Sequence, residues 1–160
     1  FRSKLTKVFR FERRIIIMGK ISVVYWSQSG NTLAMAEAIG KGITDGGAQA
    51  EVVNVSSCQV SDLDTEEVFA LGCPAMGAEV LEESEMEPFV AELEGNVKGK
   101  KIALFGSYGW GDGQWMRDWE ERMISAGATV VNGEGLICQE APDGDVISEC
   151  ESLGKQLAGM

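Results

Sequence analysis

Short apolar runs alternate with amphipathic helical patterns along this chain, and this alternation restricts the fold more than any other feature. Brief, continuously apolar runs rich in β-branched residues suit strands buried on both faces, as in a parallel sheet. We expect strands at residues 21–25, 51–55, 68–72 and 101–107, and a fifth at 129–131 that resumes around 136–138. We expect helices at residues 33–39 (with a stop signal at 44–47), 85–94, 114–125 and 144–157, and about one helical turn at 61–65. The pattern predicts one α/β domain with a parallel sheet covered by helices on both faces.

The composition predicts an acidic protein with protein partners. At 160 residues the chain is long enough for one domain with its own core, and no apolar run is long enough to span a bilayer. The formal net charge is −11. An acidic surface disfavours nucleic acid and favours encounter with an electropositive protein. We therefore expect positively charged protein partners, no nucleic-acid partner and no membrane insertion.

The first 17 residues differ in charge from the rest of the chain. They hold six Lys and Arg residues against one Glu, so the remainder has a net charge of −16. Their apolar stretch is too short for a secretory signal, and Met18-Gly19-Lys20 reads as a natural start directly before the first expected strand. We expect residues 1–17 to be a basic N-terminal extension, disordered or artefactual, and residues 18–160 to form a single domain. A basic arm that binds a membrane or nucleic acid is the alternative for residues 1–17.

Missing histidines and scattered cysteines exclude several kinds of chemistry. The chain has no His, which excludes Ser-His and Cys-His catalysis and His-ligated metals. The four cysteines (Cys58, Cys73, Cys138 and Cys150) form no C-x-x-C pair, so zinc and dithiol redox sites are poorly supported. We expect reduced, mostly buried thiols in a cytoplasmic protein.

A cluster of small polar residues separates the first expected strand from the first expected helix. It reads Ser27-Gln28-Ser29-Gly30-Asn31-Thr32. The N–H groups at a helix start have no partner within the helix, the helix dipole is positive there, and glycine lets the backbone approach a ligand. Such a position suits a phosphate group. The cluster matches neither the lysine-bearing nucleotide loop nor Gly-x-Gly-x-x-Gly, and simple helix capping is the alternative interpretation.

Two further loops are expected at the same edge of the sheet, because right-handed crossovers bring the carboxyl ends of parallel strands together. Each loop sets a large side chain among small ones: Met76 lies between Ala and Gly, and Trp110 between two Gly. Trp115 and Trp119 have helical spacing and suit the core, whereas Trp110 does not. An aromatic ring and an adaptable methionine suit stacking on a flat ligand. With the polar cluster, these loops predict a mononucleotide with a large planar base.

From about Lys20 to the C-terminus, the sequence resembles the flavodoxins, specifically the short-chain type of anaerobes related to clostridial flavodoxin. Three stretches in the right order carry the resemblance: Val24-Tyr25-Trp26-Ser27-x-Ser29-Gly30-Asn31-Thr32, Ala75-Met76-Gly77-x-Glu79-Val80-Leu81-Glu82-Glu83-Ser84-Glu85, and Ala103-Leu104-Phe105-Gly106-Ser107-Tyr108-Gly109-Trp110-Gly111-Asp112-Gly113. The resemblance implies a flavodoxin-like three-layer sandwich. Its five-stranded parallel sheet has the order 2-1-3-4-5, with FMN at the point where the strand order reverses.

The resemblance also implies a function and a set of site residues. It implies a monomeric, low-potential one-electron carrier, not an enzyme, that shuttles electrons between redox proteins on a non-covalent FMN cycling between semiquinone and hydroquinone. In this family pattern Met76 packs on the inner face of the flavin and Trp110 on the outer, Glu79 hydrogen-bonds flavin N3, and the Gly77 carbonyl turns toward flavin N5. The implied FMN site comprises Ser27, Gln28, Ser29, Gly30, Asn31, Thr32, Ala75, Met76, Gly77, Ala78, Glu79, Ser107, Tyr108, Gly109, Trp110, Gly111 and Asp112.

Three positions depart from the family pattern. Gln28 replaces a small residue in the phosphate cluster, and Pro74 stands where close relatives have a Ser that reaches the phosphate. Ala78 follows Gly77 where close relatives have Asp. If these two residues form a type II turn in the semiquinone, Ala78 must take a positive φ, which is unfavourable for Ala. We therefore expect a less stabilised semiquinone than in a version with Asp or Gly there.

Three other functions are compatible with parts of the pattern. An FMN-dependent NAD(P)H-quinone or nitro reductase of the same fold is the main alternative, but no Arg or Lys cluster is present for the phosphates of a second nucleotide. A response-regulator receiver needs an acidic pair after the first strand, where this chain has Ser27-Gln28. A binding module without a cofactor leaves Trp110 and the polar cluster without a role.

Overall fold

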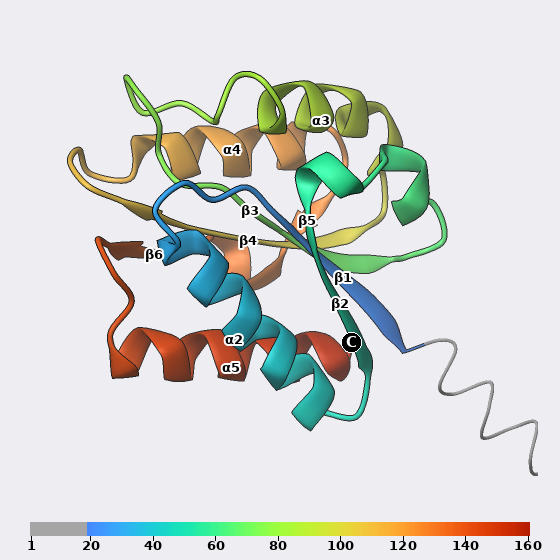
Figure 1. The fold of residues 1–160 in the computed structure, drawn as a ribbon. Helices are drawn as coiled ribbons and strands as arrows, with labels where there is room; N and C mark the ends of the chain where they lie inside the picture. The colour runs from blue at the N-terminus through green and yellow to red at the C-terminus, as the bar shows by residue number, and fades with distance from the viewer. Residues whose placement is uncertain (1–18) are drawn as a thin grey trace, which may run out of the picture.

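The computed structural model describes residues 19–160, which form a three-layer α/β sandwich (Figure 1). The extension predicted at residues 1–17 lies outside the described residues. The named strands pair in parallel, and the sheet has the predicted order β2-β1-β3-β4-β5. Its first four strands are Lys20–Tyr25 (β1), Gln49–Asn54 (β2), Val68–Gly72 (β3) and Lys101–Tyr108 (β4). The strand order reverses between β1 and β3, which is where ligands bind in open α/β sheets.

The fifth strand is split into two short pieces, as predicted. β5 (Thr129–Val130) pairs with the start of β4, and β6 (Leu136–Gln139) pairs with its end. The 3₁₀ turn η4 (Val131–Gly133) separates them and contains Asn132 in the left-handed conformation, at φ 65°. Because β6 runs beside the end of β4, the loop after β6 reaches the same edge of the sheet as the loops after β1, β3 and β4.

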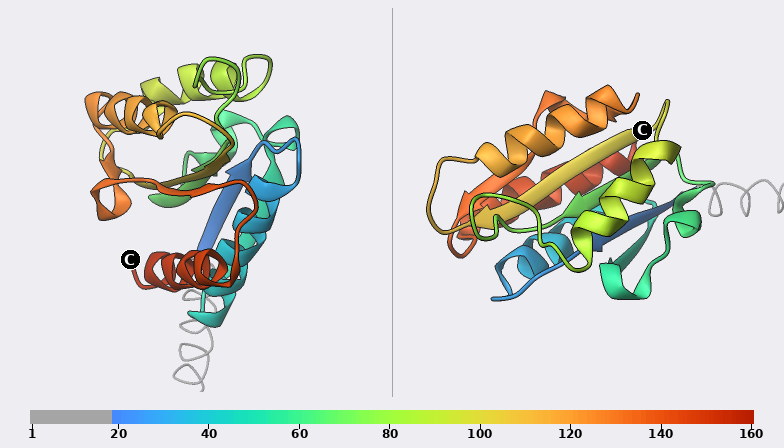
Figure 2. Two further views of the ribbon diagram at one scale, coloured as in Figure 1. Left: turned by 90° about the vertical axis from the view of Figure 1, so that its left-hand side faces the viewer. Right: turned by 90° about the horizontal axis from the view of Figure 1, so that it is seen from above.

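Helices cover both faces of the sheet. α2 (Asn31–Asp45) and α5 (Gly144–Ala158) lie on one face, and α3 (Met86–Leu93) and α4 (Gln114–Ser125) on the other (Figures 1 and 2). Two 3₁₀ turns, η1 (Val55–Ser57) and η2 (Val60–Leu63), connect β2 to β3, where about one helical turn was expected. A third, η3 (Glu94–Asn96), extends α3. The predicted doubly covered sheet is therefore confirmed.

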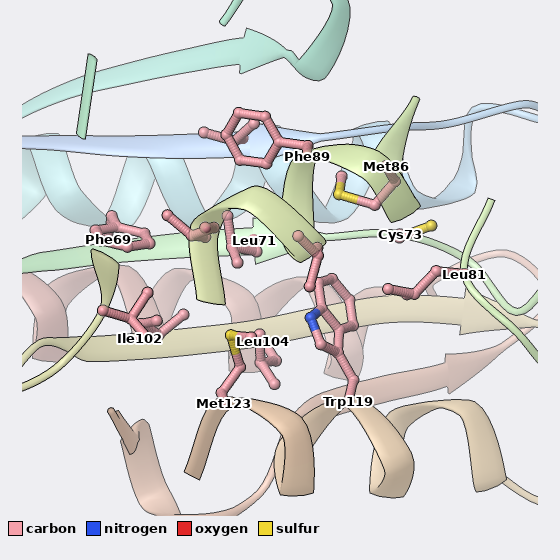
Figure 3. Close-up of a cluster of buried hydrophobic side chains, with 14 of the residues drawn as sticks. Phe69, Leu71, Cys73, Leu81, Met86, Phe89, Ile102, Leu104, Trp119 and Met123 are labelled. Atoms are coloured by element: carbon pink, nitrogen blue, oxygen red, sulfur yellow. The ribbon is translucent and has the colours of Figure 1, made fainter. Parts of the chain in front are cut away.

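Two apolar clusters hold the layers together. In the first, Met86 and Phe89 of α3 and Trp119 and Met123 of α4 meet side chains of β3 and β4 (Figure 3). The helical spacing of the apolar residues predicts that Phe89, Val90 and Leu93 point inward from α3 and that Trp115, Trp119 and Met123 point inward from α4, and all six are buried. The second cluster joins the sheet to α2 and α5. The spacing of Leu33, Ala36 and Ile39 predicts that they share one side of α2; Ala36 and Ile39 are buried and Leu33 is half-buried.

Candidate functional site

Four loops lie at the carboxyl edge of the sheet, on the left of Figure 1. Loop one (residues 26–30) follows β1, loop two (73–85) follows β3, loop three (109–113) follows β4, and loop four (140–143) follows β6. Hydrogen bonds connect them directly or through β4. Loop one and the first turn of α2 together contain the polar cluster, and loops two and three contain Met76 and Trp110.

Loop one ends at Gly30, the N-cap of α2, which is in the left-handed conformation at φ 97°. Ser27 Oγ accepts hydrogen bonds from the N–H groups of Gly30 and Leu33, both at 3.2 Å. Among the described residues, the backbone N–H groups of Gln28, Ser29 and Thr32 have no hydrogen-bond partner. One serine thus caps the helix while three backbone donors stay free, and this is the arrangement that binds an anion.

Thr32 and Ser107 connect loop one to the end of β4. The Oγ1 atom of Thr32 and the Oγ atom of Ser107 lie 3.2 Å apart, and Ser107 N donates to Thr32 Oγ1 at 3.4 Å. Both side chains are buried. Ser107 O also accepts from Ala75 N at 3.0 Å, which ties loop two to the same point. Three of the predicted site residues, one from each motif, therefore meet here.

Loop two folds into a tight turn at its predicted flavin-contacting residues. Met76 and Val80 exchange backbone hydrogen bonds of 2.8 and 2.9 Å. Within the turn Gly77 and Glu79 have positive φ values of 50° and 57°, whereas Ala78 does not. In this turn the left-handed positions belong to Gly77 and Glu79, and Ala78 has no positive φ. The positive φ considered for Ala78 concerns the turn in the semiquinone and stays a prediction. Met76 is half-buried.

The residues that follow the turn of loop two form the cap of α3. Glu82 is buried, and its carboxylate accepts backbone hydrogen bonds from Ser84, Glu85 and Met86 at 2.8–2.9 Å and another from the Ser84 hydroxyl. Burial opposes the charge, but these hydrogen bonds outweigh it and hold the pKa of Glu82 below its ordinary value. This acidic residue therefore has a structural role, although it belongs to the motif that carries the resemblance.

Loop three exposes its tryptophan. The Trp110 side chain is 67% exposed, while Trp115 and Trp119 are each 1% exposed in the core. The expectation that Trp110 does not pack into the core is confirmed. Tyr108, at the end of β4, packs against Trp115 with ring centroids 5.6 Å apart. Asp112 forms an ion pair with Arg117 at 3.0 Å, so this predicted site residue is partly neutralised.

The sequence did not predict two sets of contacts in the site: those of β6 and loop four with loop three, and that of Trp26 with α3. Gln139 Nε2 donates to the Gly109 carbonyl at 3.2 Å, and Glu140 N donates to the Tyr108 carbonyl at 2.8 Å, so the end of β6 and loop four hold loop three in place. Trp26 Nε1 donates to Glu85 at 3.1 Å and connects loop one to the start of α3. In the sequence, only the split fifth strand indicates that a loop follows residues 136–138. It does not give the register of β6 against β4, which decides which residues of β6 and loop four reach loop three.

The cysteines and the remaining charged groups offer no second chemistry at this edge. All four cysteines are free, and burial raises the pKa of Cys58 to about 11 and those of Cys73 and Cys150 to about 12, so these thiols stay protonated.

Within residues 19–160 no group of three or more Cys, Asp or Glu side chains is placed to hold a metal ion. In the same range no helix is both long and apolar enough to cross a membrane.

Comparison with known proteins gives the family. A family model described as flavodoxin matches residues 23–153. The flavodoxin of Clostridium beijerinckii is 51% identical over 140 residues, which cover 88% of this chain and 100% of the relative. The flavodoxin of Megasphaera elsdenii is 46% identical over 138 residues, which cover 86% of this chain and 98% of the relative. The solution structure of two-electron reduced M. elsdenii flavodoxin matches with a TM-score of 0.80 at 45% identity and covers 88% of this chain and 99% of that one. The chain therefore belongs to the flavodoxin family, whose members are FMN-binding electron carriers and not enzymes.

Proposed function

We propose that this flavodoxin carries single electrons between redox proteins on a non-covalent FMN held by loops one, two and three. FMN is the cofactor of the family and supplies the redox chemistry when bound, while the protein supplies binding, orientation and electrostatics. The observation that carries the placement is the free donor group at the start of α2, which lies beside two loops that present Met76 and Trp110. All of the residue roles below belong to this proposal.

The phosphate of FMN would bind at loop one and the first turn of α2. The unpaired N–H groups of Gln28, Ser29 and Thr32 supply donors, and the helix dipole favours the negative charge. Gln28 can serve through its backbone alone, so its long side chain is compatible with this role. The simple capping alternative explains Ser27, whose hydroxyl caps α2, but it leaves the three free donors unexplained.

The flavin ring would lie between loops two and three. Met76 offers a polarisable, adaptable side chain on one side, and the exposed Trp110 offers a flat aromatic face on the other. Most of the energy of covering the ring comes from removing apolar surface from water. A ligand between the loops would therefore bury the exposed surface of Trp110. It would also bury part of Val80, which is 42% exposed at the end of the turn in loop two.

The charge around the site would lower the reduction potential and select the partner. Exposed or half-buried carboxylates lie in the loops themselves: Glu79, Glu83 and Glu85 in loop two, Asp112, which is paired with Arg117, in loop three, and Glu140 in loop four. A unit charge ~10 Å from the flavin at an effective dielectric constant of ~20 disfavours an added negative charge by about 1.7 kcal/mol before screening. The same field attracts partners with a positive docking surface. We infer electropositive redox partners, a monomeric carrier and, from four cysteines that form no disulfide, a cytoplasmic location.

Within residues 19–160, no observation supports the reductase alternative. It needs a site for the phosphates of a second nucleotide, and the cation nearest in sequence to loop three, Arg117, already pairs with Asp112. Lys100 is also engaged, because its Nζ donates to the carbonyls of Leu63, Asp64 and Glu66 at 2.8–3.1 Å. We therefore propose the carrier function alone.

Titration of the cofactor-free protein with FMN and with riboflavin tests the proposal. Quenching of flavin fluorescence should show one FMN bound per chain, and riboflavin, which lacks the phosphate, should bind at least tenfold more weakly because loop one loses its ligand. Equal affinity for the two flavins would refute the phosphate role of loop one. Failure to bind FMN at all would refute the proposed function.

A further inference from the structure

The carboxylate of Glu79 joins loop two to the helix that follows loop three. Its Oε1 accepts a hydrogen bond of 3.0 Å from the backbone N–H of Gln114, the first residue of α4. The N-cap of α4 is Gly113, which has no side chain to cap the helix, so a residue 35 positions away does this instead. A carboxylate at a helix start is also stabilised by the helix dipole.

The backbone on both sides of this contact is adapted to it. Glu79 is in the left-handed conformation, which is uncommon for a residue other than glycine, and it lies within the turn closed by Met76 and Val80. On the opposite side the carboxylate lies against Gly111, where an added Cβ would stand 2.5 Å from Glu79 Cδ. Gly111 therefore leaves the space that the carboxylate occupies.

We propose that Glu79 is a positioning residue that locks loops two and three together before any cofactor binds. The inference rests on the proposed function, in which Met76 and Trp110 enclose the flavin ring. The start of loop two is tied to β4 through Cys73 and Ala75 and to α4 through the Trp115 indole N–H on the Cys73 carbonyl, and its end is tied to loop one through Trp26 and Glu85. Loop three is held by Gln139 on the Gly109 carbonyl. Among these contacts, the Glu79 hydrogen bond is the one that reaches from the tight turn beside Met76 to the residue that directly follows loop three, so it holds the ends of the two loops at a set separation and lowers the ordering cost of binding.

A double-mutant cycle on Glu79 and Gly111 tests the lock. Glu79→Ala removes the acceptor, and Gly111→Ala displaces the carboxylate from its place. In the cofactor-free protein, hydrogen exchange of the Gln114 amide should become roughly tenfold faster in either variant, as for a lost helix cap. The double variant should show little further increase, because each change removes the same contact. Additive effects, or an unchanged Gln114 amide in Glu79→Ala, would overturn the proposal.

Controls separate the lock from general effects of charge or strain. Glu83→Ala removes an exposed carboxylate from the same loop and should leave the Gln114 amide unchanged. Gly47→Ala places Ala at a similarly positive φ in open space, and it should also leave this amide unchanged. Glu79→Gln keeps an acceptor oxygen on a side chain of the same length. The Gln114 amide should therefore exchange more slowly in Glu79→Gln than in Glu79→Ala. Equal exchange in these two variants would argue that charge alone, and not the hydrogen bond, holds the loops.

A spectroscopic measurement reports on the flavin-contacting loop itself. With 5-fluorotryptophan in the cofactor-free protein, the Trp110 signal, assigned with Trp110→Phe, should shift and sharpen in Glu79→Ala and Gly111→Ala but not in Glu83→Ala. An unshifted signal would limit Glu79 to capping α4 and overturn the positioning role. Because these readouts need no FMN, they decide the lock even if the wild-type protein bound no flavin, which is instead the failure of the proposed function.

Discussion

At the scale of single residues, two tryptophans have contrasting positions: Trp115 is a buried core residue, and Trp110 is an exposed residue for which we propose a role in ligand binding. Trp115 is 1% exposed, packs against Tyr108 and donates its indole N–H to the Cys73 carbonyl at 3.0 Å. Trp110 is 67% exposed and has no comparable contact among the described residues. Side chains of the same type therefore have different roles, which their sequence neighbours already indicate: glycines flank Trp110, and helix formers surround Trp115.

Substitution of these two tryptophans should affect different properties. Trp110→Ala should change the free energy of unfolding of the cofactor-free protein by less than about 0.5 kcal/mol, because the side chain is already exposed. It should weaken FMN binding by about tenfold or more, since stacking is lost. Trp115→Ala should lower the free energy of unfolding by about 3–5 kcal/mol. Urea unfolding and flavin titration measure both effects, and a large loss of stability in Trp110→Ala would contradict the assignment.

At the scale of elements, a helix cap and a helix–helix contact show how local chemistry holds the site. The Glu82 carboxylate caps α3 and thereby fixes the end of loop two. On the other face of the sheet, α2 and α5 approach closely at Gly154, which has no side chain to keep the two backbones apart. A Cβ at Gly154 would stand only 2.1 Å from the Ile39 carbonyl oxygen. α2 starts directly after loop one, so this contact also supports the candidate site.

The cap of α3 should make stability depend on pH. The folded pKa of Glu82 is lowered, so its contribution is present above the ordinary carboxyl pKa near 4.5 and is lost as pH falls through the folded pKa. Glu82→Gln should cost about 1 kcal/mol of unfolding free energy at pH 7 and much less in acid. Burial raises the pKa of Glu66, so the contribution of Glu66 to stability changes with pH in the opposite direction to that of Glu82. The wild type and the variant must therefore be compared at the same pH. Urea unfolding at several pH values measures this difference, and Glu83→Gln, which changes an exposed carboxylate of the same loop, is the control. A difference between wild type and Glu82→Gln that does not change with pH would contradict this account.

Substitution of glycine in α5 should distinguish close packing from open space. Gly154→Ala should destabilise the protein by about 1–3 kcal/mol, because the backbones of α2 and α5 must separate. Gly144→Ala, in the same helix but with nothing within 4 Å of the added Cβ, should leave stability unchanged or slightly higher. Thermal unfolding of the two variants gives the comparison, and equal melting temperatures would argue against the close contact.

The sequence predicts the elements well and the contacts between loops poorly. The strands, including the split fifth strand, follow from apolar runs whose period and length are local properties. The loop edge follows from the handedness of the crossovers. The bonds from Gln139 to Gly109 and from Glu79 to Gln114 depend instead on register and on left-handed backbone at Glu79, which no local pattern encodes.

At the scale of the whole molecule, the net charge of −11 should make the reduction potential depend on salt. Salt screens exposed carboxylates, so the potential of the step that adds negative charge to the flavin should rise with ionic strength. Removing a single nearby charge, as in Glu83→Gln, should raise it by at most roughly 70 mV, before the screening that solvent and ions provide. Potentiometric titration at several salt concentrations measures the trend, and a salt-independent potential would contradict the electrostatic account.

The most direct test of the carrier function is a visible spectrum of the FMN-loaded protein during stepwise anaerobic reduction. The proposed function predicts oxidised flavin bands that pass through a distinct long-wavelength species, the mark of two separate one-electron steps, before they bleach. Ala78 is expected to limit how much of that species accumulates, and Ala78→Gly should then increase it. Direct bleaching in one two-electron step, in both the wild type and Ala78→Gly, would contradict the assignment of this chain as a one-electron carrier.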